Sequence, residues 1–307
     1  MHVFVQACIL GLLTGGVYAL MASGLALGFG VMRVINVAQG ALIILGAYLS
    51  YSLYGSLGID PFVGLLVVTP AMFALGVGLQ LVFLRALRDE EREELSLLVT
   101  WAIALGIEGL LSLGYNTTYR STITSYADRS WSISGYYVSV ARVYAFAASI
   151  AVLGLLFLIL RFTKLGRSIR ATVQNPTAAR LLGIDTRFAS AVGFGLSVAT
   201  ASAAGAVYGI VFPFNPGSHY DLISRLLTIV VLGGLGSLGG AVVAALFMGV
   251  WFLTNSVAQY VGGALGEMWG SVTPMYYFVV FIVTSAIGTA VLVPLINPIK
   301  KLMHGIR

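Results

Sequence analysis

Charged side chains are scarce in this chain. Its 307 residues include 17 lysines and arginines and 11 aspartates and glutamates, which together make 9% of the sequence. A soluble domain usually has about a quarter charged residues, because it needs them to coat its core. Here 59% of the residues are hydrophobic, and they recur in runs long enough to cross a bilayer at about 20 residues per crossing. The composition excludes an ordinary soluble protein and predicts a polytopic α-helical membrane protein.

Cysteine and clustered histidine are also lacking. The single cysteine, Cys8, excludes a disulfide scaffold or a thiol cluster. His2, His219 and His304 lie far apart and have no metal-ligand spacing, so we expect no metal site. The amino terminus has no basic region before its first apolar run, which continues beyond residue 25. We therefore expect the first segment to stay in the membrane rather than be cleaved as a signal peptide.

Apolar runs and the breaks between them define the predicted membrane segments. The seventh of these segments is short for a full crossing and is expected to be a half-helix. The expected fold is all-α, a single transmembrane domain over residues 1–307 with about eight or nine segments, some of them discontinuous. The predicted segments are 3–29, 37–54, 62–84, 95–114, 138–160, 189–212, 223–235, 238–258 and 271–296.

Lysine and arginine predict the orientation. They are concentrated in the connections 85–94 and 163–188 and in the tail 298–307, and basic loops favour the cytoplasmic side. Nine crossings then place the amino terminus outside and the carboxyl terminus in the cytoplasm. If the seventh segment only dips in and returns, the tail moves outside, which its lysines disfavour. Since the basic residues are spread over separate loops, we do not expect nucleic-acid binding.

The connection 163–188 contains a short helix with its own start and stop signals, in the stretch "QNPTAARLLGI". Asn175 is a good N-cap, and Pro176 suits the first helical position because its missing N–H costs nothing there. Gly183 suits the left-handed residue that ends a helix, and Ile184 can close it with an apolar contact. About seven helical residues are marginal in water alone, so this helix needs a surface to dock on.

Two surfaces fit this helix and a second helical piece that precedes it, from Arg167 to Gln174. The pair either packs on the protein's own cytoplasmic face or acts as a coupling helix that inserts into a groove of another protein. Leucine and isoleucine side chains supply apolar area, and arginine supplies charge. The predicted coupling residues are Arg167, Arg170, Asn175, Pro176, Arg180, Leu181, Leu182, Gly183 and Ile184.

The sequence lacks an ATP site of the phosphate-loop type, since the dipeptide Gly-Lys never occurs. If transport is driven by ATP, another chain must hold the ATPase, and this chain is expected to be neither an enzyme nor the carrier of a cofactor. Glu108, in "LGIEGLL", is the one clear carboxylate inside a predicted span. It either couples protons or pairs with a polar group on a neighbouring helix, and we favour the pairing.

Two stretches interrupt the predicted helices. Asn36 and Gln39 break an apolar run, and they would share one face if the helix continued; alternatively, Asn36 caps a new helix. Five glycines lie within Gly233–Gly240, too many for a stable straight helix. Broken helices at membrane depth line a cavity or are buried in protein, and tight packing through small residues is the alternative. The candidate pathway residues are Asn36, Gln39, Glu108, Gly233, Gly234, Gly236 and Ser237.

Three stretches together resemble the permease subunits of branched-chain amino acid ABC importers, the Liv type. They are "GLLTGGVYALMASGLALGFGVMRVINVAQGALIILGAYLSY" (11–51), "GRSIRATVQNPTAARLLGID" (166–185) and "VLGGLGSLGGAVVAALFMG" (231–249). The similarity runs over most of the chain in the same order, and the first stretch looks most like the LivH-type subunit. The second stretch looks like that family's cytoplasmic coupling loop. One departure is Gln39, in "NVAQG", where the family usually has histidine.

The resemblance implies a prokaryotic inner-membrane permease that forms half of a pathway for branched-chain or other small amino acids. It implies as partners a second homologous permease, two cytoplasmic ATPase subunits that hold ATP and Mg²⁺, and an extracytoplasmic solute-binding protein. Relatives with this pattern also import urea, short amides and small organic acids. A proton-coupled secondary transporter and a passive solute channel are the competing interpretations of the residues.

Overall fold

The computed structural model describes residues 2–32, 34–84, 92–127, 129–133 and 136–249, with single positions at 275, 279, 282, 283 and 286. Within these residues, six helical segments are long and apolar enough to cross a membrane. The ends of the helices that contain them lie within three residues of the first six predicted segments. The helices are α1 (His2–Met32), α2 (Gln39–Leu57), α3 (Pro61–Leu79) with a π-helical turn Gln80–Leu84, α4 (Arg92–Tyr115), α5 (Val140–Phe162) and α8 (Thr186–Val211).

The predicted all-α, polytopic fold is confirmed. The predicted total of eight or nine segments stays a prediction, because most of 250–307, which includes the segment 271–296, lies outside the described residues. The single-domain prediction stays open for the same reason. One element absent from the prediction is a short antiparallel hairpin, β1 (Ser130–Ile133) with β2 (Tyr136–Ser139).

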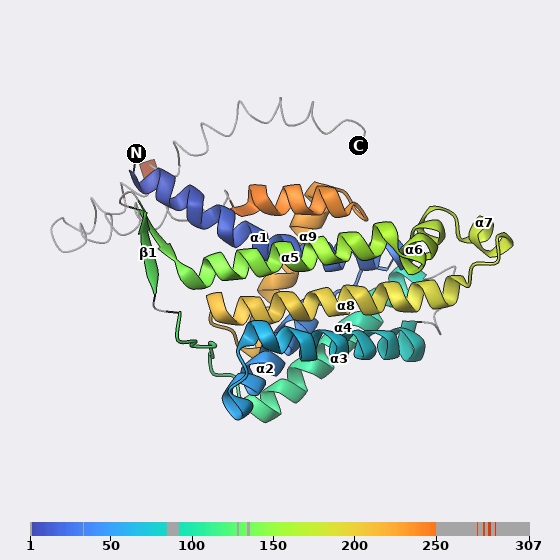
Figure 1. The fold of residues 1–307 in the computed structure, drawn as a ribbon, viewed down its shortest axis with the longest axis horizontal. Helices are drawn as coiled ribbons and strands as arrows, with labels where there is room; N and C mark the ends of the chain where they lie inside the picture. The colour runs from blue at the N-terminus through green and yellow to red at the C-terminus, as the bar shows by residue number, and fades with distance from the viewer. Residues whose placement is uncertain are drawn as a thin grey trace. The chain divides into compact units, whose positions relative to one another are not determined.

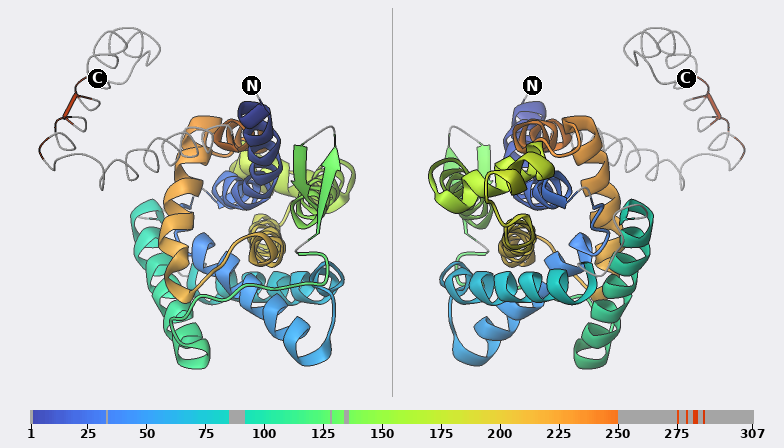
Figure 2. Two further views of the ribbon diagram at one scale, coloured as in Figure 1. Left: turned by 90° about the vertical axis from the view of Figure 1, so that its left-hand side faces the viewer. Right: turned by 90° about the vertical axis from the view of Figure 1, so that its right-hand side faces the viewer.

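Helix α8 lies at the centre of the described bundle and is buried along 89% of its most apolar window. Figure 2 shows it end-on, surrounded by the other long helices. Its sequence explains this place, because glycine, alanine and serine allow other backbones to approach closely. A Cβ atom on Gly205 would lie 1.9 Å from the Ile43 carbonyl oxygen of α2, and one on Gly195 would lie 2.9 Å from the Phe73 ring of α3.

The loops gather at the two opposite ends of the long helices (Figure 1). The hairpin lies at one end, and α6 (Lys164–Gln174) and α7 (Pro176–Leu181) lie at the other. Near the hairpin, Asp60 caps α3 by accepting from Phe62 N at 2.9 Å, and it also accepts a hydrogen bond from the Tyr126 hydroxyl at 2.9 Å. Burial, followed by this hydrogen bond to a carboxylate, raises the pKa of Tyr126. The predicted placement of the two loops on opposite sides of a membrane is compatible with this arrangement.

After α8 the chain forms a bent pair of helices. Helix α9 (His219–Gly233) follows a 3₁₀ turn, Pro216–Ser218, and the helix Leu238–Gly249 leaves it at a bend of 119°. Figures 1 and 2 show α9 running across the direction of α8. The predicted break in the glycine-rich stretch is therefore confirmed, and the expected short seventh segment is α9. The pair is either one broken span or a re-entrant loop.

Candidate functional site

The segment between α5 and α8 is built by successive helix caps. Thr163 Oγ1 accepts from Gly166 N at 3.0 Å and starts α6, and Asn175 Oδ1 accepts from Ala178 N at 3.0 Å and starts α7. Pro176 occupies the first position of α7, as predicted. Asp185 then caps α8 by accepting from the backbone N–H groups of Arg187 and Phe188. Each cap satisfies donors that a helix end would otherwise leave without partners.

The end of α7 also follows the prediction. Gly183 has a φ of 78°. Ile184 N donates to Ala179 O and Gly183 N to Arg180 O, both at 3.0 Å. These two bonds define a Schellman motif, which closes a helix on a left-handed residue. The helix has six residues, one fewer than expected.

The side chains of this segment divide into an inner and an outer set. Ile169 of α6 and Ala179 of α7 are buried, so both helices are anchored to the bundle. Leu181 and Leu182 are 84% and 80% exposed. These two leucines point away from the chain's own face, which favours the coupling interpretation over packing on that face.

The remaining predicted coupling residues have different surroundings. Arg180 Nε donates to Thr186 Oγ1 at 3.0 Å, so this arginine ties α7 to the start of α8. Ile184 is half-buried and contributes less outward apolar area than expected. Arg167 and Arg170 are exposed on α6, and Arg170 also donates to the Arg161 carbonyl oxygen at 3.4 Å.

The break between α1 and α2 places a polar cluster inside the bundle. Helix α2 starts at Gln39 after a turn in which Gln39 N donates to Asn36 O at 3.1 Å. Neither predicted alternative is right, because the helix does not continue and its N-cap position is held by Ala38. Asn36 and Gln39 are fully buried, and Asn36 Nδ2 donates to Gln39 Oε1 at 3.1 Å.

Residues of α1 and α8 complete this cluster. Ser197 Oγ lies 2.6 Å from Gly24 O and 3.4 Å from Gln39 Oε1. Within the described residues, Asn36 Oδ1 and Gln39 Nε2 make no hydrogen bond. Buried polar atoms without partners cost free energy, so each of them needs a physical explanation. The cluster joins α1, α2 and α8 at the break between α1 and α2.

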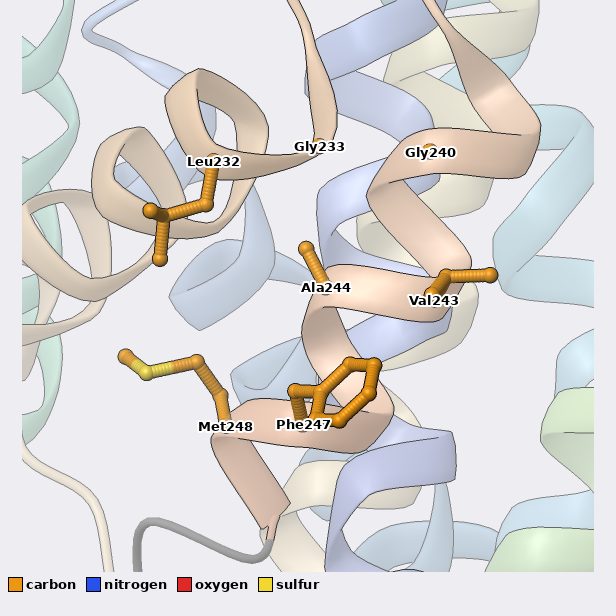
Figure 3. A pocket seen from close by; sticks show the side chains of 7 residues that line it. All are labelled: Leu232, Gly233, Gly240, Val243, Ala244, Phe247 and Met248. Atoms are coloured by element: carbon orange, nitrogen blue, oxygen red, sulfur yellow. The ribbon is translucent and has the colours of Figure 1, made fainter. Parts of the chain in front are cut away.

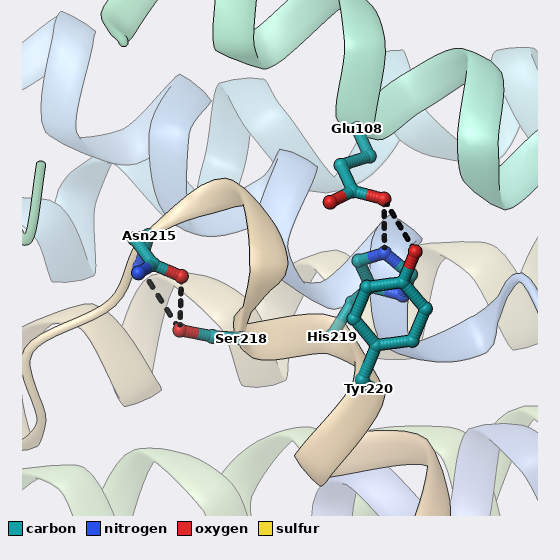
Figure 4. A network of polar contacts seen from close by, with 5 residues as sticks. All are labelled: Glu108, Asn215, Ser218, His219 and Tyr220. Carbon is teal, nitrogen blue, oxygen red and sulfur yellow. Dashed lines mark hydrogen bonds and ion pairs between the residues drawn. The ribbon is translucent and has the colours of Figure 1, made fainter. Parts of the chain in front are cut away.

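Glu108 of α4 meets the start of α9 (Figure 4). Its Oε2 atom lies 3.1 Å from His219 Nε2 and accepts a hydrogen bond from the Tyr220 hydroxyl at 2.8 Å. A capping box formed by Asn215 and Ser218 fixes the 3₁₀ turn Pro216–Ser218 that leads into α9. The carboxylate also lies near the positive end of the α9 dipole. Glu108 thus pairs with polar groups on a neighbouring helix, as the favoured interpretation predicts.

Sequence reasoning missed His219 and Tyr220. They directly precede the predicted segment 223–235, and a carboxylate inside a span should have a partner on another segment. Their pairing with Glu108 joins residues more than 110 positions apart in the sequence, and no local sequence pattern predicts so distant a contact.

The glycine-rich elbow depends on backbone conformation and close contact. Gly234 and Gly236 have φ values of 90° and 81°, which residues with a side chain rarely adopt. A Cβ atom on Gly240 would lie 1.7 Å from the Gly233 carbonyl oxygen, so the two arms touch through their backbones. Ser237 Oγ accepts from Gly240 N at 3.1 Å and starts the second arm.

An open apolar pocket of about 450 Å³ lies in the elbow (Figure 3). It is formed by the last turn of α9 and by one face of the following helix. The predicted pathway residue Gly233 lines it, whereas Gly234, Gly236 and Ser237 form the bend beside it. The lining residues are Leu232, Gly233, Gly240, Val243, Ala244, Phe247 and Met248.

The structure does not gather all the predicted pathway residues into one cluster. Asn36 and Gln39 lie in the buried cluster, and Glu108 lies at the start of α9. The elbow glycines lie at the other end of α9, although Gly236 reaches α1 at Gly30, where its added Cβ would be 3.3 Å from the Gly30 Cα. Helix α9 connects the three groups. Its first residue, His219, contacts Glu108 and packs on Gly40 in the first turn of α2. Its last residue, Gly233, belongs to the elbow.

Comparisons with known proteins agree on one family. Residues 8–288 match the model of the family described as "Branched-chain amino acid transport system / permease component". The chain is 28% identical to the Escherichia coli high-affinity branched-chain amino acid transport system permease protein LivH over 270 residues, covering 80% of this chain and 84% of that protein.

Two further relatives extend this result. BraD, the corresponding permease protein of Pseudomonas aeruginosa, is 26% identical over 263 residues, with the same coverage. The autoinducer 2 import system permease protein LsrC of Escherichia coli is 38% identical over 96 residues, which is 30% of this chain and 28% of LsrC. No solved structure matches the chain. This chain belongs to the permease component family of branched-chain amino acid transport systems.

Proposed function

We propose that this chain is the permease subunit of an ATP-driven importer and forms half of the pathway for branched-chain or other small amino acids. Family membership supports the transport role. The observation that carries the ATP-driven part is the rigidly capped α7, which presents Leu181 and Leu182 outward at one end of the bundle. Two adjacent exposed leucines on a helix too short to be stable alone favour a docking surface on another protein.

Energy enters through partner chains in this proposal. The chain has no phosphate loop, so two cytoplasmic ATPase subunits hold ATP and Mg²⁺ and dock on α6 and α7. The chain itself is not an enzyme and carries no cofactor of its own. A second homologous permease completes the pathway, and an extracytoplasmic solute-binding protein delivers the substrate. Movement of α7 reaches the bundle through α8, because Asp185 and the Arg180–Thr186 contact join the two helices.

Orientation follows from this docking. The protein is a multi-pass protein of the prokaryotic inner membrane, and we propose that the α6–α7 end lies in the cytoplasm. The amino terminus is then outside and the carboxyl terminus inside. The concentration of arginine and lysine in 163–188 supports this orientation.

The polar cluster and the elbow are the candidate moving parts of the pathway. Asn36 and Gln39 are fully buried at the break between α1 and α2, and the glycine-rich bend separates α9 from the next helix. Urea, short amides and small organic acids are the alternative substrates.

The coupling role is tested by comparing Leu181→Asp with Asn175→Ala. Leu181→Asp places a carboxylate in the proposed apolar contact, where an unpaired charge is costly. We expect ATPase association to fall by about tenfold or more, which corresponds to about 1.4 kcal/mol. Asn175→Ala removes only the cap and costs roughly 1 kcal/mol of helix stability, so coupling weakens while assembly persists.

The measurement is pull-down of the ATPase subunits together with ATP turnover in reconstituted membranes. Thr177→Ala is the control, because Thr177 is exposed on the same helix and makes no cap. Parental association and turnover in Leu181→Asp would show that α7 is not the coupling element.

A proton-coupled secondary transporter is the second candidate, and the Glu108–His219 pair favours it. The carboxylate and the imidazole lie 3.1 Å apart on two different helices. The two candidates differ in energy source: collapse of uptake on adding a protonophore at constant ATP supports proton coupling. A passive channel would equilibrate its solute without accumulating it.

A further inference from the structure

Helix α9 carries a polar face that is partly exposed at the edge of the described bundle. Asp221, Ser224 and Thr228 are exposed, and Arg225 is half-exposed between them. These positions are spaced by three and four residues, so they form one stripe on the helix. The opposite face is apolar and buried, and it consists of Leu222, Ile223, Leu226, Ile229 and Val230.

Two independent contacts place this stripe near the middle of the membrane. Arg225 Nη1 donates to the Tyr18 hydroxyl at 3.2 Å, and Tyr18 lies two residues from the middle of the α1 span Cys8–Met32. At the start of α9, His219 contacts Glu108, which lies within one turn of the middle of the α4 span Glu94–Tyr115. Because α9 runs across the long helices, its face stays near this depth (Figure 2).

A charged face at this depth cannot be placed against lipid tails. Ionisable residues inside a membrane pair with one another or face a polar cavity, and they mark substrate pathways. Here Arg225 Nη2 lies 2.9 Å from Asp221 Oδ2, and the two side chains are 35% and 64% exposed. The pair has no net charge, but it presents a cation and an anion side by side to a molecule that binds beside α9.

We propose that Arg225 and Asp221 bind the zwitterionic head group of an amino acid during its passage. This inference rests on the proposed function, since it names where that substrate is recognised. On binding, the guanidinium exchanges its two contacts with Asp221, through Nε and Nη2, for paired hydrogen bonds to the α-carboxylate, and the aspartate then binds the α-ammonium. The bound solute adds no net charge at mid-membrane depth.

Neighbouring residues fit the rest of such a solute. The Tyr18 hydroxyl, buried in α1, orients the guanidinium. The polar stripe gives way to Val231 and Leu232, and Leu232 lines the apolar pocket of about 450 Å³ two turns beyond Arg225 on the same face. A polar head at Arg225 and an apolar surface further along α9 match an amino acid with an apolar side chain.

The test compares single and double neutral variants. Arg225→Gln or Asp221→Asn alone leaves one charge without its partner, so either can disturb the fold. The double variant removes both charges and is structurally mild, because replacing both members of an ion pair is often neutral. Arg129→Gln, at an exposed arginine of the 116–139 loop, is the matched control for loss of positive charge.

Ligand binding is measured as thermal stabilisation of the purified complex by leucine, by leucinamide, which lacks the carboxylate, and by 4-methylpentanoate, which lacks the ammonium. We expect the parent and Arg129→Gln to respond to leucine and much less to the two analogues. The double variant should lose the leucine response and show uptake reduced by roughly tenfold or more, as expected on losing charge-assisted contacts.

The outcomes separate this inference from the proposed function. Parental leucine binding and uptake in the double variant would overturn the site, whatever the energy source. Loss of association between the two permeases in that variant would assign the stripe to their interface and also overturn it. If the parent binds leucine through these residues but shows no ATP-dependent uptake, the site stands and the proposed function fails.

Discussion

Glu108 shows how a single side chain in a membrane helix depends on its partners. Its Oε2 atom accepts from Tyr220 and lies beside His219, whose side chain is 2% exposed. Removing the carboxyl group would leave two polar groups of α9 without a partner at membrane depth. Keeping an oxygen at the same place would preserve most of these contacts.

We expect Glu108→Gln to retain most ATP-driven uptake, because its amide oxygen still accepts a hydrogen bond and energy comes from partner chains. Glu108→Leu should destabilise the protein by about 1–3 kcal/mol, the cost of leaving the buried His219 side chain without its partner. Uptake and thermal unfolding in detergent are measured for both. Abolished uptake in an assembled Glu108→Gln complex would favour proton coupling.

Gly205 determines how closely α8 approaches α2. Gly205→Ala should prevent normal packing, because its Cβ would lie 1.9 Å from the Ile43 carbonyl oxygen, a backbone atom that cannot move aside easily. Gly154→Ala in α5 is the matched control, since no atom lies within 4 Å of its added Cβ. The control should be neutral or stabilise by up to about 1 kcal/mol, the helix propensity difference. Equal unfolding temperatures for the two variants would contradict this packing.

At the scale of elements, the elbow between α9 and the helix Leu238–Gly249 combines strain with contact. Gly240→Ala should disrupt the 119° bend and reduce uptake strongly, because its Cβ would lie 1.7 Å from the Gly233 carbonyl oxygen. Gly239→Ala changes the adjacent residue, whose Cβ would meet no atom within 4 Å, and should be tolerated. Uptake and complex yield of the two variants give the comparison. Similar behaviour would mean that the close approach is not required.

At the scale of the whole molecule, the two loop ends should face opposite sides of the membrane. Thr117, just after α4, and Thr177, in α7, are both exposed. With Cys8 replaced by serine, cysteines introduced at these positions should react differently with an impermeant reagent added outside. Thr117→Cys should be labelled and Thr177→Cys should not; the reverse pattern would overturn the proposed orientation.

The sequence by itself determined the features that depend on neighbouring residues. Apolar run length predicted the first six spans, and Asn175, Pro176 and Gly183 predicted α7 with both of its ends. The glycines around 233–240 predicted the bend. Each of these signals acts over one or two helical turns, so one sequence is enough to find them.

Only the tertiary structure decided which distant residues meet. Ser197 reaches Gln39 across 158 positions, Glu108 finds His219 across 111, and Arg225 reaches Tyr18 across 207. Tertiary packing also left the charged face of α9 partly exposed and placed Arg225 beside the middle of the α1 span. These contacts depend on how closely the small residues of α8 let the surrounding helices approach, and no local pattern specifies that geometry.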